Sequence, residues 1–432
     1  MAPPAICSAS TIHLTGPIMK ILHTSDWHLG RSLHIKKRHE EHQAFLQWLL
    51  KEIDSRQIDV LLIAGDVFDS GLPSIGAQEL YYKFLSQVAQ SCCRHVVIIA
   101  GNHDSPSFLN APGALLKALR IHVVGAATDD PADEVFVLRR RDNTPELLVA
   151  AVPFLRDRDI RKAEAGESTE DKSQKLIQGI GNHYDAVFAA AEQRRAELGQ
   201  DLPLVAMGHL FTDGGRLIEG DGVRELYVGA LPGVAPTIFP ASVDYVALGH
   251  LHVPQTVNDS NHIRYCGSPL PMGFNEAEQQ KIVCLVEFQG RETTVEPLPV
   301  PVFQKLQTVQ GDWDAISSRL DGLAKSGQSV WLNIVYDGNE IIGDLSQRLE
   351  NAVTRTCLDI VRSRNCQTAE QALRQQSMDE TLDDLEDHDV FERLLVMKEV
   401  PESQRPDLRR TYQEALAALE DPERAAGNEG QP

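Results

Sequence analysis

The feature that most constrains how this sequence can fold is a series of five apolar runs, each followed closely by Asp, Asn or His. The runs are rich in Val, Ile, Leu and Ala, which is typical of buried strands. In chain order, the polar residues after them read Asp26-x-His28, Asp66-x-x-Asp69, Asn102-His103-Asp104, His209 and His250-x-His252. Ligands of open α/β folds bind at the carboxyl ends of strands, so we expect the five clusters to meet in one site.

Residues 19 to about 275 alternate between such runs and helical patterns. After the first run, EEHQAFLQWLLKEI places Phe45, Leu49 and Ile53 at helical spacing. A further apolar run, LLVAAVP at 147–153, reads as another buried strand. This alternation predicts an α/β domain with a central sheet.

The opening cluster, in ILHTSDWHLG, pairs a carboxylate with an imidazole two residues later. On an extended chain, alternate side chains share a face, so Asp26 and His28 should point one way and Trp27 the other. Such a pair suits a metal ion. A surface loop with an isolated His gives the same short motif, so the other four clusters have to decide between a metal site and a surface loop.

Together the clusters offer seven oxygen and nitrogen ligands, which is enough for two divalent ions that share one carboxylate. Two such ions supply a nucleophilic water and neutralise phosphoryl oxygens. Two carboxylates against two divalent ions leave a positive centre, which attracts an anionic diester. Each motif alone is more often structural, and GNHD could be a turn with Asn at positive φ. Five coincidences in order favour the dinuclear site.

The composition sets weaker limits. A chain of 432 residues with 42% hydrophobic and 24% charged residues should form two or three soluble globular domains. The seven cysteines form no CxxC pair and are odd in number, so we expect reduced thiols and a cytoplasmic location. Residues 1–18 lack the features of a signal peptide, and we expect a disordered tail or start-site extension there.

The net charge of −21 argues against a nucleic-acid partner at first sight, because phosphate affinity comes from Lys and Arg. The acidic residues are concentrated, however: from Met378 onward there are 16 Asp and Glu against 6 Lys and Arg. The rest of the chain holds basic clusters at 31–38, 139–141 and 156–162. The bulk charge therefore neither excludes nor proposes DNA.

Beyond 275 we expect two further regions. The first is the region 276–370, in which PLPVPVF (297–303) marks a linker. Beyond this linker we expect a small α/β module, with strands at 330–336 and 357–363 and helices near 312–325 and 341–355. Residues 371–432 are acidic and helical. Leu408, Tyr412, Leu416 and Leu419 share one helix face there.

The ordered motifs resemble those of the calcineurin-like metallophosphoesterase superfamily. Within it, MKILHTSDWHLG, AGDVFDSG, AGNHDSP, ALGHLH and RYCGSP are similar to bacterial exonuclease subunits. Protein phosphatases differ, because they carry GNHE and an Arg after GDxxD, where this sequence has Ser70. The resemblance implies an α/β fold built on a β-sandwich flanked by helices, with a capping domain at 276–370 and C-terminal helices.

The resemblance also implies a role for each site residue. Asp26, His28 and His252 would hold one metal, Asn102, His209 and His250 the other, and Asp66 would bridge them. His103 would donate to the phosphate or leaving oxygen, with Asp69 as its orienting partner. The family's usual metal is Mn²⁺, although the ligand types alone would also accept Zn²⁺ or Fe.

The implied activity is 3′→5′ exonuclease on duplex DNA and endonuclease on single strands and hairpins, in repair, recombination and replication. The sequence has no G-x-x-x-x-G-K-[ST] loop, so ATP hydrolysis would belong to a partner, an ABC-type ATPase with long coiled coils. The helices of 371–432 are candidate docking helices for it. A homodimer is also implied, and the basic clusters at 31–38 and 156–162 are candidate phosphate contacts.

Two other classes stay open. Another dinuclear phosphoesterase, such as a phosphatase or cyclic-nucleotide phosphodiesterase, would share the metal site but would not need the second module or the acidic tail. A non-catalytic scaffold could keep the fold to anchor a partner. The intact His103 and the complete ligand set argue against the scaffold.

Overall fold

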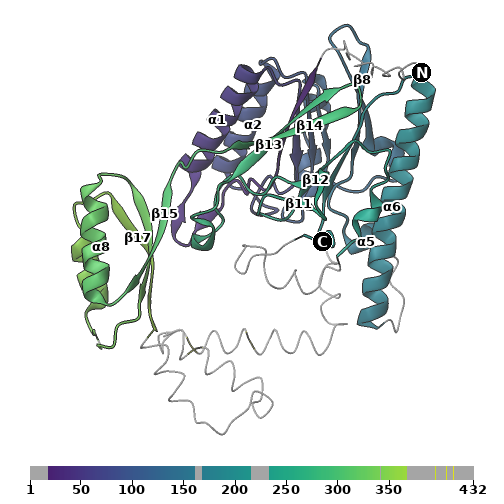
Figure 1. Cartoon of the computed structure of the whole chain (residues 1–432). Coiled ribbons are helices and arrows are strands. Elements are labelled where there is room, and N and C mark those ends of the chain that lie inside the picture. Colours follow the sequence, from purple (N-terminus) through teal and green to yellow (C-terminus); the bar gives the residue numbers. More distant parts are fainter. Residues whose placement is uncertain are drawn as a thin grey trace, which may run out of the picture. The chain divides into compact units, whose positions relative to one another are not determined.

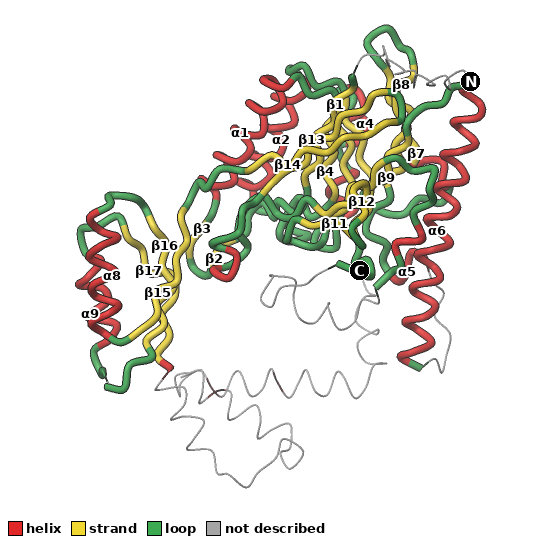
Figure 2. The backbone as a smooth tube through the Cα atoms, in the orientation of Figure 1, coloured by secondary structure: helices red, strands yellow, loops and turns green. Residues whose placement is uncertain are grey.

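The six expected buried strands lie inside two six-stranded sheets, three in each, shown in Figures 1 and 2. The other six strands were not predicted from the sequence. The structure is a computed structural model, and it describes residues 18–160, 168–215, 233–340 and 342–366 together with Leu395, Arg405 and Tyr412. The expected N-terminal extension and C-terminal helices therefore lie almost entirely outside the described residues.

The first sheet has the order β14-β13-β1-β4-β5-β6. Strands β1, β4, β5 and β6 run parallel, and β13 pairs antiparallel with β1. The bounds are Met19–Thr24 (β1), Val60–Ala64 (β4), His95–Ile99 (β5), Ile121–Val124 (β6), Ile282–Gln289 (β13) and Glu292–Pro299 (β14).

The second sheet has the order β11-β12-β10-β9-β8-β7. Its four inner strands run parallel, and both edge strands are antiparallel to their neighbours. The bounds are Val135–Arg139 (β7), Pro145–Ala151 (β8), Leu204–His209 (β9), Tyr245–Gly249 (β10), Gln255–Val257 (β11) and Ser260–Tyr265 (β12).

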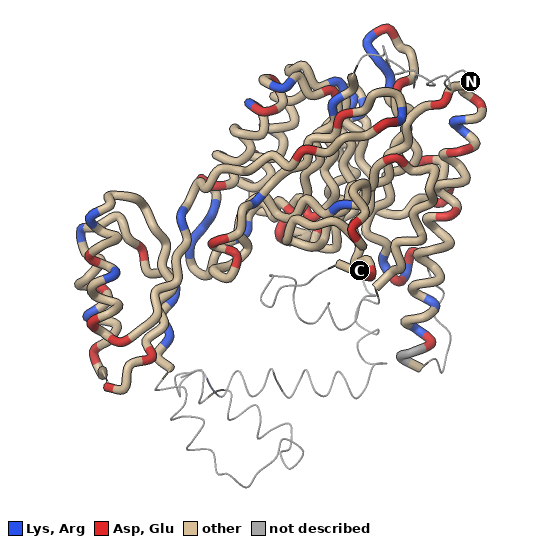
Figure 3. The backbone as a smooth tube through the Cα atoms, viewed as in Figure 1, with Lys and Arg blue, Asp and Glu red and all other residues tan. Residues whose placement is uncertain are grey.

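The two sheets pack face to face as a sandwich. Between them lies a core in which Val60 and Leu62 of the first sheet join Val205 and Ala247 of the second. Helices α1 (His39–Arg56) and α2 (Ile75–Ala89) cover the outer face of the first sheet, and α6 (Thr169–Leu198) covers that of the second. Strands buried on both faces are apolar throughout, which explains the continuous runs in the sequence. Lys, Arg, Asp and Glu lie mainly on helices and loops (Figure 3).

Shorter elements fill the connections. They are the strands Ser32–Leu33 (β2) and Lys36–Lys37 (β3), the helices Pro106–Asn110 (α3), Gly113–Ala118 (α4) and Asp157–Ile160 (α5), and three 3-10 turns at Pro131–Glu134, Pro236–Ile238 and Phe274–Glu276. None of the helices in the described part of the chain is long and apolar enough to cross a membrane.

The sandwich extends beyond the boundary expected at residue 275. Strand β13 pairs with β1, and β14 pairs with β13 as far as Pro299. The interpretation of PLPVPVF as a linker was therefore wrong for its first three residues, because Pro297 and Pro299 lie in β14 opposite Cys284 and Ile282. Proline is tolerated there because β14 is an edge strand, where an N–H can be missing without breaking a ladder.

The module after the sandwich contains the elements that the sequence predicted. A three-stranded sheet has the order β15-β16-β17, with bounds Lys305–Gly311, Val330–Tyr336 and Leu358–Asn365. Helices α8 (Trp313–Lys325) and α9 (Leu345–Val353) connect its strands. Buried and partly exposed residues alternate along β16, as expected for a strand with one covered face.

Candidate metal centre

The five polar clusters meet at the carboxyl ends of parallel strands in both sheets. Asp26 and His28 follow β1, Asp66 follows β4, and Asn102 follows β5, all from the first sheet. From the second sheet, His209 ends β9, and His250 and His252 follow β10. Nearly all of these side chains are buried. The stacking of the two sheets, which brings these strand ends together, therefore creates the site.

Asp66 lies at the centre of the cluster. Its Oδ2 atom is 3.6 Å from Nε2 of His28 and 3.4 Å from Nε2 of His209. A carboxylate between two imidazoles from different sheets has the placement that a bridging ligand needs. The bridging role itself stays a prediction.

Two sets of side chains flank Asp66. On one side, Nε2 of His28 lies 3.2 Å from Nε2 of His252, and Asp26 has a carboxylate oxygen within 4.8 Å of both. On the other side, Nε2 of His209 and Nδ1 of His250 each lie 3.1 Å from Oδ1 of Asn102. These are the two groups of three expected from the sequence.

The spacing of these atoms fits metal ions. Ligand atoms that bind one ion at about 2.0–2.2 Å lie roughly 3 Å apart. Two imidazole nitrogens of His28 and His252 face each other at 3.2 Å, which a shared cation explains better than a hydrogen bond between two histidines. The donor set of imidazole nitrogens, carboxylates and one amide oxygen suits Mn²⁺, Zn²⁺ or Fe²⁺.

The backbone that presents these ligands is unusual. Asp26, His28, Asp66 and His250 have φ angles of 53°, 47°, 49° and 103°. Residues other than glycine rarely adopt positive φ angles, and those that do concentrate at functional sites. The opening cluster is thus not the extended strand end assumed from its alternation, although Trp27 is buried in the core and Asp26 and His28 reach the site as expected.

Gly65 shows why glycine precedes Asp66. Its φ is +87°, and a Cβ atom there would collide with the imidazole of His209. Glycine is therefore required both for the backbone conformation and for the close approach of the two sheets.

Several contacts fix how the ligands point. His209 donates from Nδ1 to the carbonyl of Ala64 at 2.9 Å, which leaves Nε2 as the atom that faces Asp66. The carboxylate of Asp26 accepts from the main-chain N–H of His250 at 3.0 Å and from the Ser25 hydroxyl. Ser25 in turn contacts Sγ of Cys266 at 3.1 Å.

His252 is held through its main-chain carbonyl. That oxygen accepts from the N–H of Ser268 and from Nζ of Lys281, each at 3.1 Å. Lys281 is almost fully buried and forms an ion pair with Glu276 at 2.6 Å. Cys266 and Ser268 belong to RYCGSP. Through Cys266 this motif contacts Ser25, which binds Asp26, and through Ser268 it binds the carbonyl of His252. The sequence identified the motif but gave no sign of Lys281.

His103 and Asp69 lie at the edge of this cluster and are partly exposed. His103 donates from Nδ1 to the main-chain carbonyl of Asp69 at 2.9 Å. The Asp69 carboxylate instead lies 3.3 Å from Nδ1 of His28 and 3.0 Å from Nη1 of Arg31. The expected pairing of His103 with Asp69 is thus made by the main chain, and the carboxylate supports His28.

Asp104, the last residue of GNHD, has a structural place. Its carboxylate accepts hydrogen bonds from the main-chain N–H groups of Gly101, Val67 and Phe68 at 2.8–3.1 Å. Burial raises the pKa of Asp104 to about 6. This carboxylate joins the loops after β4 and β5, and so sets the distance between Asp66 and Asn102.

The electrostatics of the centre reflect its crowded charges. Burial raises the pKa of Asp26 to about 6 and lowers that of His250 to about 3. Burial alone would lower the pKa of His209, but the Asp66 carboxylate raises it to about 9. Carboxylates that hold a proton on an imidazole so strongly would hold a cation in the same place.

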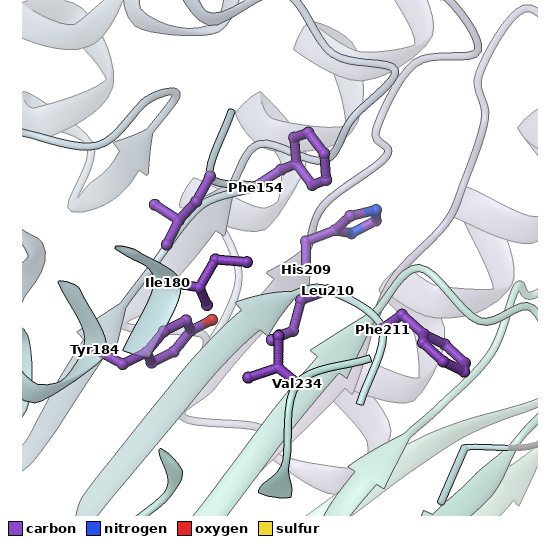
Figure 4. A pocket seen from close by; sticks show the side chains of 8 residues that line it. Phe154, Ile180, Tyr184, His209, Leu210, Phe211 and Val234 are labelled. Atoms are coloured by element: carbon purple, nitrogen blue, oxygen red, sulfur yellow. The ribbon is translucent and has the colours of Figure 1, made fainter. Parts of the chain in front are cut away.

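A small apolar pocket lies beside His209 (Figure 4). Tyr184 and Ile180 from α6 line it together with Phe154, whose ring centroid is 6.3 Å from that of His209. This lining excludes water from one side of the imidazole and limits its rotation. The pocket therefore supports His209, a predicted metal ligand, and is too small for a nucleotide.

The class of protein follows from this geometry and from sequence profiles. Residues 19–254 match the profile of the calcineurin-like phosphoesterases, and residues 302–399 match a profile described as the type 5 capsule protein repressor C-terminal domain. The first match spans more than half of the chain and covers every predicted ligand. The fold and site are thus those of a metallophosphoesterase.

Curated relatives narrow the class. The chain is 37% identical over 404 residues to the SbcD subunit of nuclease SbcCD from Escherichia coli K12, which covers 93% of this chain and 98% of the relative. The SbcD subunits of Rhodobacter capsulatus and Bacillus subtilis are also 37% identical, over 66% and 64% of this chain and 70% and 68% of their own lengths. The chain belongs to the SbcD family of nuclease subunits, and is a metal-dependent phosphodiesterase.

Proposed function

We propose that this chain is a Mn²⁺-dependent 3′→5′ exonuclease on double-stranded DNA and an endonuclease on single strands and hairpins. The observation that carries the proposal is the position of Asp66 between two complete ligand groups. Two bound cations would neutralise the phosphoryl oxygens and activate water. The names of the relatives, which are nuclease subunits, support a nucleic acid as the substrate.

The chain's own residues divide the remaining work. Asp66, Asp26, His28 and His252 would hold one cation, and Asp66 with Asn102, His209 and His250 the other. His103, held at Nδ1 by the Asp69 carbonyl, keeps Nε2 for the phosphate or the leaving 3′ oxygen, to which it would donate a proton. Because Nδ1 keeps its proton, donation from Nε2 requires the imidazolium form of His103, and burial lowers the pKa of His103, which makes that form a stronger acid but a less populated one near neutral pH.

The test is cleavage of a 5′-labelled duplex by the purified chain with Mn²⁺, beside turnover of a generic aryl phosphate. A ladder of shortened labelled strands that requires both Mn²⁺ and Asp66 is expected. Asp66→Asn removes the central charge, and Asp142→Asn, an exposed carboxylate on the β7–β8 hairpin, is the matched control. Turnover of the aryl phosphate with intact DNA would favour a phosphatase or cyclic-nucleotide phosphodiesterase instead.

We further propose that the chain works with an SbcC-type ABC ATPase, because its relatives are named as subunits of SbcCD. The acidic helices expected at 371–432 would dock to that partner. Removal of the residues after 370 should abolish co-purification with SbcC and leave the metal content unchanged. Co-purification of the shortened chain would place the docking surface elsewhere.

A homodimer is part of the same proposal. Large apolar side chains are exposed at Leu72 (92%), shortly before α2, at Ile75 (75%), the first residue of α2, and at Leu115 (66%) on α4. These are the candidate contacts between two copies. Leu72→Asp with Ile75→Asp should convert a dimer into a monomer by light scattering.

The six cysteines in the described part of the chain are all free, which fits a cytoplasmic location.

A further inference from the structure

A sixth strand end contributes to the surroundings of the metal centre. Strand β8, whose run LLVAAVP carries no ligand, lies beside β9 in the second sheet. Its following loop is fixed to the first sheet, because the N–H of Phe154 donates to the carbonyl of Ala100 at 2.8 Å. Arg156 follows two residues later, directly before α5.

The guanidinium of Arg156 is held close to the predicted catalytic residues. Nη2 donates to the main-chain carbonyl of Asp104 at 2.9 Å, and Asp104 is the neighbour of His103. The Cζ atom lies 5.8 Å from the centroid of the Phe154 ring, which also contacts His209. Arg156 is therefore one residue away from His103 through Asp104, and one side chain away from the predicted ligand His209 through Phe154.

This guanidinium still has donors to offer. Arg156 forms no ion pair with a carboxylate of the described residues, and its buried Nη1 atom has no hydrogen-bond partner among them. A buried donor without a partner is costly, and a charged one more so. A phosphodiester would satisfy it, because its oxygens accept two N–H groups of a guanidinium at once.

Three other basic residues of the two candidate clusters are engaged differently. Arg38 is 1% exposed and binds Glu41 and the carbonyl of Pro271, so it is a structural residue rather than a phosphate contact. Arg31 is paired with Asp69. The side chain of Arg158 is 76% exposed and lies 3.6 Å from Asp159.

We propose that Arg156 binds the phosphodiester next to the scissile one and so positions a polynucleotide strand against His103. The inference rests on the proposed nuclease function and deepens it. The neighbouring phosphate is the target because Phe154 and Asp104 stand between the guanidinium and the ligands. Arg156 thus favours a polymer, which has a flanking phosphate, over an isolated phosphoester.

The first experiment compares Arg156→Ala and Arg156→Lys with Arg158→Ala, a matched arginine two residues away that points to water. The substrates are a DNA oligonucleotide and thymidine 5′-(4-nitrophenyl) phosphate, which has one phosphate only. Arg156→Ala should raise KM for DNA about 10- to 100-fold, the range for a lost charge-assisted hydrogen bond, with less effect on kcat. Its loss on the ester should be at least 5-fold smaller than on DNA. Equal losses on both substrates, or a loss no greater than that of Arg158→Ala, would overturn the proposal.

The second experiment changes the DNA and not the protein. Oligonucleotides with a single neutral methylphosphonate on either side of the scissile position are tested with wild type and Arg156→Ala. At one flanking position, the methylphosphonate should weaken DNA cleavage by wild type about 10-fold or more. It should weaken cleavage by Arg156→Ala little, because the guanidinium that binds this phosphate is already absent from the variant. An equal penalty in both proteins at every position contradicts the contact.

Failure of the proposed function would be visible separately. Wild type that binds but does not cut DNA, with Mn²⁺ present, speaks against the nuclease. The Arg156 contact is then decided by anisotropy, with the same variants and methylphosphonates in Asp66→Asn protein. Arg156→Ala should bind DNA at least 10-fold more weakly than Arg158→Ala and lower the salt dependence by about one ion. Equal affinities would refute the contact whatever the chemistry of the site.

Discussion

Nδ1 of His103 donates to the main-chain carbonyl of Asp69 at 2.9 Å, and the carboxylate of Asp69 faces His28 instead. A main-chain acceptor cannot be removed by a side-chain substitution. The orientation of His103 is therefore separable from the charge of Asp69, and the two residues should behave differently when each is changed.

Replacing His103 with Ala should keep both metals and lower kcat by about 10²–10⁴-fold, because the proton donor is removed while the predicted ligands stay. Metal content by elemental analysis and single-turnover cleavage of DNA would be measured on the same preparation. Loss of one metal per chain in His103→Ala would instead make His103 a ligand.

Replacing Asp69 with Asn should weaken metal binding about 10-fold, because the carboxylate no longer supports His28, while cleavage recovers in excess Mn²⁺. The carboxylate also neutralises Arg31, so the variant should bind the Mn²⁺ near His28 less tightly for both reasons. Titration of activity against Mn²⁺ gives the result. A kcat that stays about 10²-fold low at saturating metal would return the orienting role to the carboxylate.

Replacing Lys281 with Met should destabilise the chain by about 3–5 kcal/mol, because the buried Glu276 loses its partner. It should also weaken the metal near His252, whose carbonyl loses a donor. The double variant Lys281→Met with Glu276→Leu should regain stability without regaining metal affinity, and Lys281→Arg should restore part of both. Calorimetry and Mn²⁺ titration separate the two effects. If metal affinity returned together with stability, Lys281 would be a structural residue only.

Acidification should destabilise the metal-free chain through His23. This residue lies between the sheets with Nδ1 2.9 Å from the Tyr245 hydroxyl, and burial lowers its pKa to about 3. The unfolded chain binds a proton below about pH 6.5 and the folded chain does not, so stability falls as the pH drops from about 6.5 towards 3. The slope per buried histidine is about 1.4 kcal/mol per pH unit.

The measurement is denaturant unfolding between about pH 4 and 7 in EDTA. His23→Gln should show a slope smaller than wild type by about one proton, and the exposed His262→Gln should match wild type. An unchanged slope in His23→Gln would assign the acid sensitivity to other groups.

Much of the candidate metal centre was predictable because each predicted ligand lies at or just after the end of a buried strand. The continuous apolar runs at 60–66 and 243–250 locate the strands, and parallel strands present their carboxyl ends at one edge. The contacts of Asp69 were not predictable. A main-chain carbonyl and a carboxylate of one residue cannot be told apart as partners of His103 from residue types alone.

The supporting residues were also out of reach of the sequence. Lys281 lies 29 residues from His252, whose carbonyl it contacts. A single Lys in a loop is more often a solvated charge, and only its burial beside Glu276 gives it a role. Arg156 looked equivalent to Arg158 from the sequence, whereas in the structure the Arg156 side chain is partly buried and that of Arg158 is exposed.

The sequence by itself determined the central strands, the α/β class and the candidate ligand residues, because apolar runs and short motifs are local properties of the chain. The tertiary structure decided that two sheets stack so that Asp66 lies between His28 and His209, and that Arg156 binds the main-chain carbonyl of Asp104 next to His103. These are contacts between distant segments, and their geometry follows from the packing of the two sheets, which no local pattern specifies.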